Sequence, residues 1–415
     1  METRRANGYI PPMERDLADT LTRWRRHLHA HPDPTLDEGP TAAFVAARLR
    51  ELGVTDIAEG VGGHGVVATI SRPGGRNGAG GGAAAGGNRA VALRADMDAL
   101  PIAEATGLPH ASTRSGVMHA CGHDGHTAAL LGAAALLLRD ESWSGTVRLV
   151  FQPAEEGGGG ARAMVEDGLF RRFPVDAIYG WHNWPGLPVG TVAVHDAAVM
   201  AAGNRFEVAV RGHAGHAALP HLTRDPVLAA GHLIVAAQSI VARTLDPLDT
   251  GVVSLTTVQG GSAWNQIASE VTLRGTMRFL RPEVGDGIFA ALERIAAGVS
   301  ATYGVEAAAT RLGGVDATVN DPAAREVAAV AAAAVAPALR RDLPPAMTGE
   351  DFSRFLREVP GAFVWIGNGP AEGGRELHHP NYDFEDAVLP VASAYLAEVA
   401  RRELSGAREA ASATP

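Results

Sequence analysis

The sequence contains no lysine, because all 36 basic residues are arginine. This absence excludes Schiff-base chemistry, a pyridoxal phosphate anchor and the lysine of a phosphate-binding P-loop. Positive charge is also in deficit, with a formal net charge of −10. This acidic balance and the lack of a long basic run argue against nucleic acid as a partner. Charged residues still make up 20% of the chain beside 46% hydrophobic ones, a composition typical of a globular enzyme.

Long apolar segments are missing as well. No uninterrupted apolar run reaches about 18 residues, so we expect no membrane-spanning helix and no membrane partner. The first twenty residues carry several charges and no apolar core, so we expect no secretory signal. The single cysteine, Cys121, cannot form a disulfide within the chain. Together these features predict a protein of the reducing cytoplasm.

The order of the predicted elements indicates two domains, as the length of 415 residues also does. Strands and helices alternate in the first part of the chain, which favours an α/β fold with a largely parallel, mixed sheet. The middle of the chain changes to the order strand, helix, strand, strand, helix, which favours an inserted, smaller α+β domain. We expect the catalytic domain in two parts, 1–196 and 304–415, interrupted by a satellite domain at 197–303.

The densest group of chemically useful side chains lies at residues 119–126, where three histidines, an aspartate and Cys121 occur together. Imidazole and thiolate are good ligands for divalent transition metals, and Cys121 and His123 present both from one short segment. A closed structural zinc site needs four ligands from paired motifs, and the chain has no second cysteine. The cluster therefore points to a catalytic metal site or to nucleophilic chemistry.

Further metal-binding side chains follow the ends of predicted strands. Glu155 and Glu156 come after the strand at 146–151, and His182 ends the strand at 177–181. His378 follows another strand, at 362–367. The carboxyl ends of the strands in an open α/β sheet are where ligands collect. We therefore expect these side chains to gather at one edge.

Two adjacent glutamates suit metal-assisted hydrolysis. One carboxylate anchors a metal while its neighbour takes a proton from the attacking water. Two metals sharing His, Cys and Glu ligands would polarise the scissile carbonyl. Asp96, at the end of the strand at 91–95, is a candidate to hold a ligand histidine by a hydrogen bond.

These segments closely resemble the amidohydrolase branch of the aminoacylase/carboxypeptidase metallopeptidase superfamily, which includes hippurate hydrolase, N-acyl-L-amino-acid amidohydrolases and indole-acetyl-amino-acid hydrolases. The resemblance covers nearly the whole chain, from Arg25 to Pro390. The motifs that carry it occur in family order and are Arg94–Pro101, His119–His126, Pro153–Gly157, His182–Gly186, Gly212–Pro220 and Leu377–Pro380.

The resemblance implies a catalytic domain that binds two divalent metal ions, and a satellite domain that also forms a homodimer contact. Carried over motif by motif, it implies Glu155 as the general base. Zinc, manganese, cobalt and nickel all suit such a mixed donor set. The metal ligands that the resemblance implies are Cys121, His123, Glu156, His182 and His378.

For the satellite domain, the resemblance implies that His216 stabilises the tetrahedral intermediate, supplied by the partner subunit in many relatives. It further implies that Asn265 and Arg278 grip the substrate carboxylate. The chain departs from the family in a longer glycine-rich insertion at 73–89. It also departs in the residues that precede Glu350-Asp351-Phe352, a segment similar to the Glu-Asp-Phe of relatives.

We therefore expect a metal-dependent hydrolase that cleaves the amide bond of small N-acyl amino acids. Two alternatives stay open. In the first, Cys121 is a thiolate nucleophile with His119 or His126 as its base. In the second, the chain is a metal-binding homologue that has lost catalysis. The intact Glu155-Glu156 pair speaks against this alternative, because loss of the general base would be the simplest way to lose catalysis. The acyl group and the amino acid are left open by the sequence.

Overall fold

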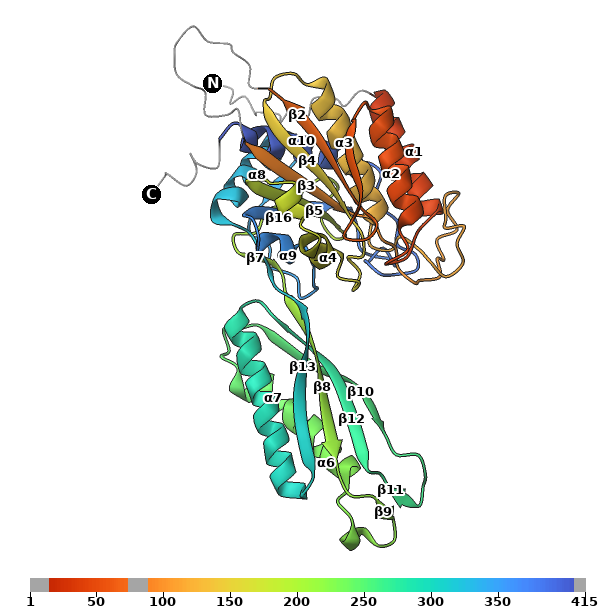
Figure 1. The fold of residues 1–415 in the computed structure, drawn as a ribbon, viewed down its shortest axis with the longest axis vertical. Coiled ribbons are helices and arrows are strands. Elements are labelled where there is room, and N and C mark those ends of the chain that lie inside the picture. The colour runs from red at the N-terminus through yellow and green to blue at the C-terminus, as the bar shows by residue number, and fades with distance from the viewer. Residues whose placement is uncertain (1–14, 74–88, 407–415) are drawn as a thin grey trace, which may run out of the picture. The chain divides into compact units, whose positions relative to one another are not determined.

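The computed structural model describes residues 15–73 and 89–406, and these residues form two compact units (Figure 1). The first unit comprises the described residues of 1–199, 319–344 and 351–415, and the second comprises 200–318 and 345–350. The chain leaves the first unit within β7 (Ala198–Met200) and returns within β14 (Thr318–Val319). Most of the glycine-rich insertion lies outside the described residues.

The first unit is built on an eight-stranded sheet in the order β1-β2-β4-β3-β5-β16-β6-β15. Its central strands β4, β3, β5 and β16 are parallel, whereas β1 and β2 add antiparallel pairs at one side. The expected mixed, largely parallel sheet is therefore confirmed. The strands are β1 (Asp56–Val61), β2 (Gly65–Arg72), β3 (Ala90–Asp96), β4 (Gly145–Gln152), β5 (Ala177–Trp184), β6 (Val192–Ala193), β15 (Leu339–Arg340) and β16 (Gly361–Gly367).

Helices pack on this sheet and bury its central strands. Every residue of β16 is buried, as expected for a parallel strand covered on both faces. Helix α3 packs against α1, α10 and β3, and α8 packs against β16. The helices are α1 (Arg15–Ala30), α2 (Gly39–Glu51), α3 (His123–Arg139), α4 (Gly160–Glu166), α5 (Leu169–Arg172), α8 (Pro322–Val335), α9 (Ser353–Leu356) and α10 (Val388–Leu404). None of the described helices is long and apolar enough to span a bilayer.

The second unit is an antiparallel sheet in the order β10-β12-β8-β13, with two helices packed on one face. Alternate residues of β12 are buried, as the period of two requires for a sheet covered on one face. The elements are β8 (Ala202–Arg211), β9 (Gly215–His216), a 3-10 turn (Pro220–Leu222), α6 (Pro226–Ala237), a π-helical turn (Ile240–Thr244), β10 (Gly251–Gly260), β11 (Gln266–Ile267), β12 (Glu270–Phe279), α7 (Pro282–Tyr303) and β13 (Glu306–Val315).

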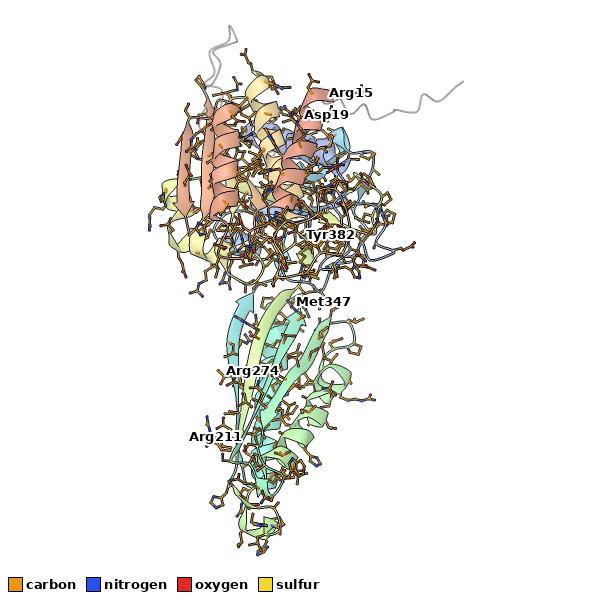
Figure 2. The ribbon with its side chains drawn as sticks, turned by 90° about the vertical axis from the view of Figure 1, so that its right-hand side faces the viewer. Arg15, Asp19, Arg211, Arg274, Met347 and Tyr382 are labelled. Atoms are coloured by element: carbon orange, nitrogen blue, oxygen red, sulfur yellow. The ribbon has the colours of Figure 1, made fainter. Side chains whose placement is uncertain are left out.

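The opposite face of this sheet carries cross-strand ion pairs. Arg211 pairs with Glu270 at 3.0 Å and Arg274 with Glu207 at 2.9 Å, and Figure 2 labels both arginines. The unit also extends one strand past the boundary expected at residue 303. The reason is that β13 hydrogen-bonds to β8 along most of its length and so belongs to this sheet.

Candidate metal centre

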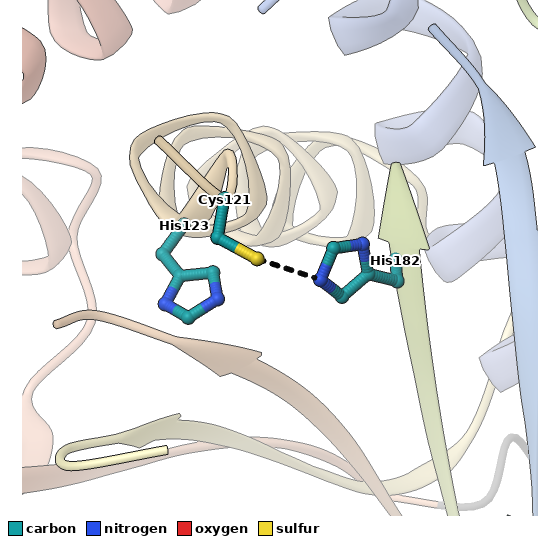
Figure 3. A group of neighbouring side chains, drawn as sticks. All are labelled: Cys121, His123 and His182. Atoms are coloured by element: carbon teal, nitrogen blue, oxygen red, sulfur yellow. Dashed lines mark hydrogen bonds between the residues drawn. The ribbon is translucent and has the colours of Figure 1, made fainter. Parts of the chain in front are cut away.

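Cys121 and His123 flank Gly122 at the start of helix α3. Gly122 has a left-handed backbone with φ of 94°. A Cβ there would lie 2.3 Å from the Asn183 Oδ1 atom, so only glycine fits. This tight entry places the Cys121 and His123 side chains beside His182, as Figure 3 shows. The Cys121 Sγ atom lies 3.4 Å from the His182 Nε2 atom.

His182 lies near the carboxyl end of β5, where the sequence predicted a ligand. Its Nδ1 atom lies 2.7 Å from the backbone oxygen of Asn183, which selects the tautomer with a lone pair on Nε2. Burial and the neighbouring His126 lower the pKa of His182 well below its usual value. The ring is therefore neutral and ready to donate its Nε2 lone pair to a metal.

His123 is a buried imidazole with one nitrogen engaged and one free. Its Nδ1 atom lies 2.9 Å from the Asp98 backbone oxygen and 3.3 Å from the Asp98 carboxylate. Its Nε2 atom is buried without a hydrogen-bond partner among the described residues. Burial opposes a charge on this ring, yet the carboxylates of Asp96 and Asp98 raise its pKa to about 10. The same negative field attracts a divalent cation.

Glu155 and Glu156 occupy the turn after β4, and Asp98 fixes this turn. The Asp98 carboxylate accepts the backbone N–H groups of Glu155 at 3.1 Å and Glu156 at 3.0 Å. Thr35 donates its hydroxyl to the same carboxylate at 2.7 Å. Asp98 therefore contacts both the candidate ligand His123 and the glutamate pair, which makes it the organising side chain of the site.

His378 reaches the site from the loop after β16. It has a left-handed backbone with φ of 65°, and its backbone N–H donates to the Ala120 oxygen at 2.8 Å. The His378 Nε2 atom lies 3.2 Å from the Glu156 Oε1 atom. A strained backbone in a non-glycine residue often marks a functional position.

The donor set fits divalent metals. The ligand atoms of Cys121, His123 and His182 lie within 4.8 Å of one another, and so do those of Cys121, Glu156 and His378. Cys121 belongs to both groups. A third group joins His123 to Glu155 and Glu156. The structure thus brings together every ligand that the resemblance implied, and a soft thiolate with imidazole and carboxylate suits zinc-like ions.

Asp96 lies behind this site at the end of β3. Its Oδ1 atom lies 2.6 Å from the His126 Nδ1 atom, and His126 also contacts the Asn183 Oδ1 atom at 2.7 Å. The hydrogen bond to a ligand histidine that we expected from Asp96 is made by Asp98. Sequence reasoning did not predict the role of Asp98, and it considered His126 only as a base for Cys121, although both residues lie in the motifs that carried the resemblance.

Buried charged side chains on α1 hold the first turn of α3 in place. Arg25 contacts the Asp124 carboxylate at 3.0 Å, and the His29 Nδ1 atom lies 2.8 Å from the same oxygen. Burial disfavours a charge on His29, but Asp124 and Glu104 raise its pKa to about 9. The Arg25 and His29 charges hold the pKa of Asp124 far below its usual value despite burial. This cluster anchors the helix that presents Cys121.

The remaining predicted residues lie in the second unit. His216 is exposed on β9, which pairs with β11, and the Ala217 N–H donates to the Asn265 oxygen at 2.9 Å. His216 and Asn265 are therefore neighbours. Arg278 lies near the other end of β12, beside Gly203.

Comparison with known proteins agrees with this geometry. Residues 92–402 match the model of Peptidase family M20/M25/M40. The chain is 40% identical to the N-acetyl-L-cysteine deacetylase of Bacillus subtilis (strain 168) over 398 residues, covering 95% of this chain and 90% of the relative. It is 35% identical to the hippurate hydrolase of Campylobacter jejuni over 391 residues, covering 94% of this chain and 98% of the relative.

A solved structure is also similar throughout. The crystal structure of a dinuclear metal-binding peptidase of Bacillus subtilis matches with a TM-score of 0.81 and 36% identity, covering 94% of this chain and 99% of that one. The resemblance inferred from the sequence motifs is thereby confirmed, and the chain belongs to the amidohydrolase branch of peptidase family M20/M25/M40.

Proposed function

We propose that this protein is a metal-dependent amidohydrolase that cleaves N-acyl amino acids to a carboxylate and a free amino acid. The observation that carries the proposal is the convergence of two ligand groups on Cys121, with Glu155 beside them. The relatives named above are a deacetylase of an N-acetyl amino acid and a hippurate hydrolase.

Five residues would hold two divalent ions. When bound, such ions supply Lewis-acid activation of the amide carbonyl and of water. We propose zinc, manganese, cobalt or nickel as the metal, since the donor set accepts each. The ligand residues are Cys121, His123, Glu156, His182 and His378.

Glu155 is the proposed general base. Its neighbour Glu156 lies against His378, which supports placing the Glu156 carboxylate in the ligand set. The ligand atoms of Glu155, His123 and Glu156 lie within 4.8 Å of one another, so Glu155 lies beside the ligand set. From there it takes a proton from the attacking water and delivers it to the leaving amine.

The second unit supplies the other proposed groups. We assign His216 to the developing oxyanion, and Asn265 and Arg278 to the substrate carboxylate. His216 and Asn265 lie near the Glu270 end of β12, whereas Arg278 lies near its other end. The strand between Glu270 and Arg278 spans about 25 Å at roughly 3.3 Å per residue. One small substrate cannot touch both ends, which supports contributions from two chains.

A homodimer through the second unit is accordingly part of the proposal. Strand β10 lies at one edge of the four-stranded sheet, and an edge strand offers unpaired backbone groups to a second copy. Helix α6 adds exposed apolar side chains at Val227, Leu228 and Val235. Val258 on β10 is exposed as well. Such a surface is typical of a subunit contact.

The cysteine-nucleophile alternative is less well supported. A nucleophilic cysteine needs a lowered pKa, whereas burial and the carboxylates of Glu156 and Glu155 raise the pKa of Cys121 well above its usual value. Among the described hydrogen bonds, that thiol contacts His182 and neither His119 nor His126. A single buried thiol committed to metal also suits the reducing cytoplasm, where we place the protein.

A substrate panel tests the proposal. The purified enzyme, stripped of metal and reloaded separately with zinc, manganese, cobalt or nickel, is assayed on N-acetyl, N-benzoyl and N-indole-acetyl amino acids. We expect hydrolysis of at least one class with at least one metal. Binding of metal without release of any free amino acid from the panel would favour the non-catalytic alternative.

A further inference from the structure

Arg94 is a buried guanidinium on the central strand β3, and it joins two buried carboxylates. Its side chain is fully buried, and it lies two residues from Asp96 on the same face of the strand. The Arg94 Nη1 atom donates to the Asp96 Oδ2 atom at 2.7 Å. The Arg94 Nη2 atom lies 3.4 Å from the Asp351 Oδ1 atom. Burying a charged guanidinium costs free energy unless carboxylates pair with it, as Asp96 and Asp351 do here.

Gln152 completes the hydrogen-bond network around Arg94 and fixes the geometry of that network. In the β3–β4 register it lies opposite Asp96. It accepts from the Arg94 Nε atom at 2.8 Å and donates to the Asp351 Oδ1 atom at 2.7 Å. Asp96, Gln152 and Asp351 therefore present oriented acceptors to the planar guanidinium, a geometry that a lysine ammonium cannot match.

The Asp96 end of this network lies against the metal ligands. The Asp96 Oδ2 atom, which accepts from Arg94, is also 3.7 Å from the His123 Nε2 atom. That nitrogen is the atom of His123 left free to bind a metal. Arg94 thus holds the Asp96 oxygen that lies nearest to this nitrogen. Without Arg94, we expect this oxygen to shift and to disturb the placement of the His123 ring.

The Asp351 end lies against the proposed base. The Asp351 carboxylate accepts the Ala161 N–H at 3.0 Å, which fixes the start of the Asp351 segment against α4. The Asp351 backbone N–H points to the Glu155 Oε1 atom at 3.4 Å. One guanidinium therefore reaches a metal ligand through Asp96 and the general base through Asp351.

We propose that Arg94 is a positioning residue that keeps His123 available to the metal and holds Glu155 in place through Asp351. The Glu155 half rests on the proposed catalysis, whereas the His123 half rests only on the proposed metal binding. Loss of Arg94 damages both halves of the site, whereas loss of the Asp351 charge damages only the base.

Zinc titration of the stripped, full-length protein tests the metal half without any substrate. Arg94→Met removes the charge at similar volume, and we expect the apparent zinc dissociation constant to rise by about 10- to 100-fold, the range for partners that orient a ligand. Asp351→Asn should leave zinc affinity within about 2-fold, because the Arg94–Asp96 contact is unchanged. Arg94→Lys should recover part of the loss, since one ammonium can still pair with Asp96.

Arg148→Met is the matched control. Arg148 lies on the neighbouring strand β4, where it contacts Thr69 and lies over the Phe173 ring, away from the site. The Arg148→Met variant measures the effect of removing a partly buried arginine from the same sheet. We expect its zinc affinity and its turnover to match wild type. Circular dichroism establishes that each variant is folded.

The rate at saturating zinc tests the base half. We expect Arg94→Met and Asp351→Asn each to lower kcat by at least about 10-fold, and the double variant to be no slower than Arg94→Met, because both act through one path. Wild-type zinc affinity in folded Arg94→Met, or rate losses that multiply in the double variant, overturns the proposal. If wild type hydrolyses no acyl amino acid, the proposed function fails separately and the zinc titration alone decides the role of Arg94.

Discussion

The Nδ1 atom of His123 lies 2.9 Å from the backbone oxygen of Asp98 and 3.3 Å from its carboxylate. This contact fixes the ring so that its Nε2 atom faces the other ligands. The same carboxylate accepts the backbone N–H groups of Glu155 and Glu156. A residue absent from the expected ligand set thus aligns a ligand with the proposed base.

Asp98→Asn should therefore weaken metal binding by about 10- to 100-fold, the range observed for partners of metal ligands. The amide keeps the shape but loses the charge that orients His123. Equilibrium dialysis against a chelator of known affinity measures the change. Thr35→Val, which removes only the hydroxyl donor to Asp98, is the control and should change affinity less. Equal affinities for wild type and Asp98→Asn would contradict this role.

Removing the metal should abolish hydrolysis, and returning it should restore activity, because the proposed ligands come from separate segments. Dialysis against chelator followed by metal addition, with activity on an N-acyl amino acid as the readout, checks this. Full activity after exhaustive chelation, combined with inactivation of the metal-free enzyme by a thiol alkylator, would instead support Cys121 as the nucleophile.

Substitutions of the two adjacent glutamates should differ in their effects on bound metal. Glu155→Gln should keep bound metal while turnover falls by about 10²–10⁴-fold, the contribution of a general base. Glu156→Gln should lower metal occupancy as well, because Glu156 lies against His378. Elemental analysis of both purified variants gives the answer. A loss of metal in Glu155→Gln alone would reverse the two assignments.

His216→Ala should lower turnover by about 10²–10³-fold, the usual contribution of an oxyanion donor, with metal content unchanged. Its exposure predicts little effect on folding. If the partner subunit supplies His216, heterodimers of His216→Ala with Glu155→Gln should regain activity, since one hybrid site has both groups intact. Inactive, verified heterodimers would place His216 in its own subunit or outside catalysis.

The buried His29–Asp124 pair predicts a loss of stability in alkaline solution. The folded state raises the pKa of His29 from 6.5 to about 9, so its contribution is complete below pH 6.5 and is lost as the pH rises through about 9. That contribution is on the order of 3 kcal/mol. The melting temperature of the metal-loaded protein should fall over this range. His29→Gln should be less stable at pH 6.5 and show a smaller fall, and an equal fall in both proteins would contradict the assignment.

Local pattern alone predicted much of the first unit. The strand at 146–151 is β4, because apolar periodicity reports burial directly. It also gave the candidate metal residues, since strand ends in a parallel sheet meet at one edge. The strand at Glu306–Val315 was not predicted, and its residues were placed in the second part of the catalytic domain, because none of them is fully buried and the segment has no clear apolar period.

The sequence by itself singled out the candidate side chains: Cys121, His123, the two glutamates and the distant His182 and His378 follow from residue type and motif order. Only the tertiary structure decided how they are held. Asp96 and Asp98 look equivalent in the chain, yet Asp98 contacts His123 and the glutamate turn while Asp96 contacts His126 and Arg94. Arg94 meets Asp351 across more than half the chain. Such contacts depend on strand register and loop packing, which are set by long-range burial rather than by the residues adjacent in sequence.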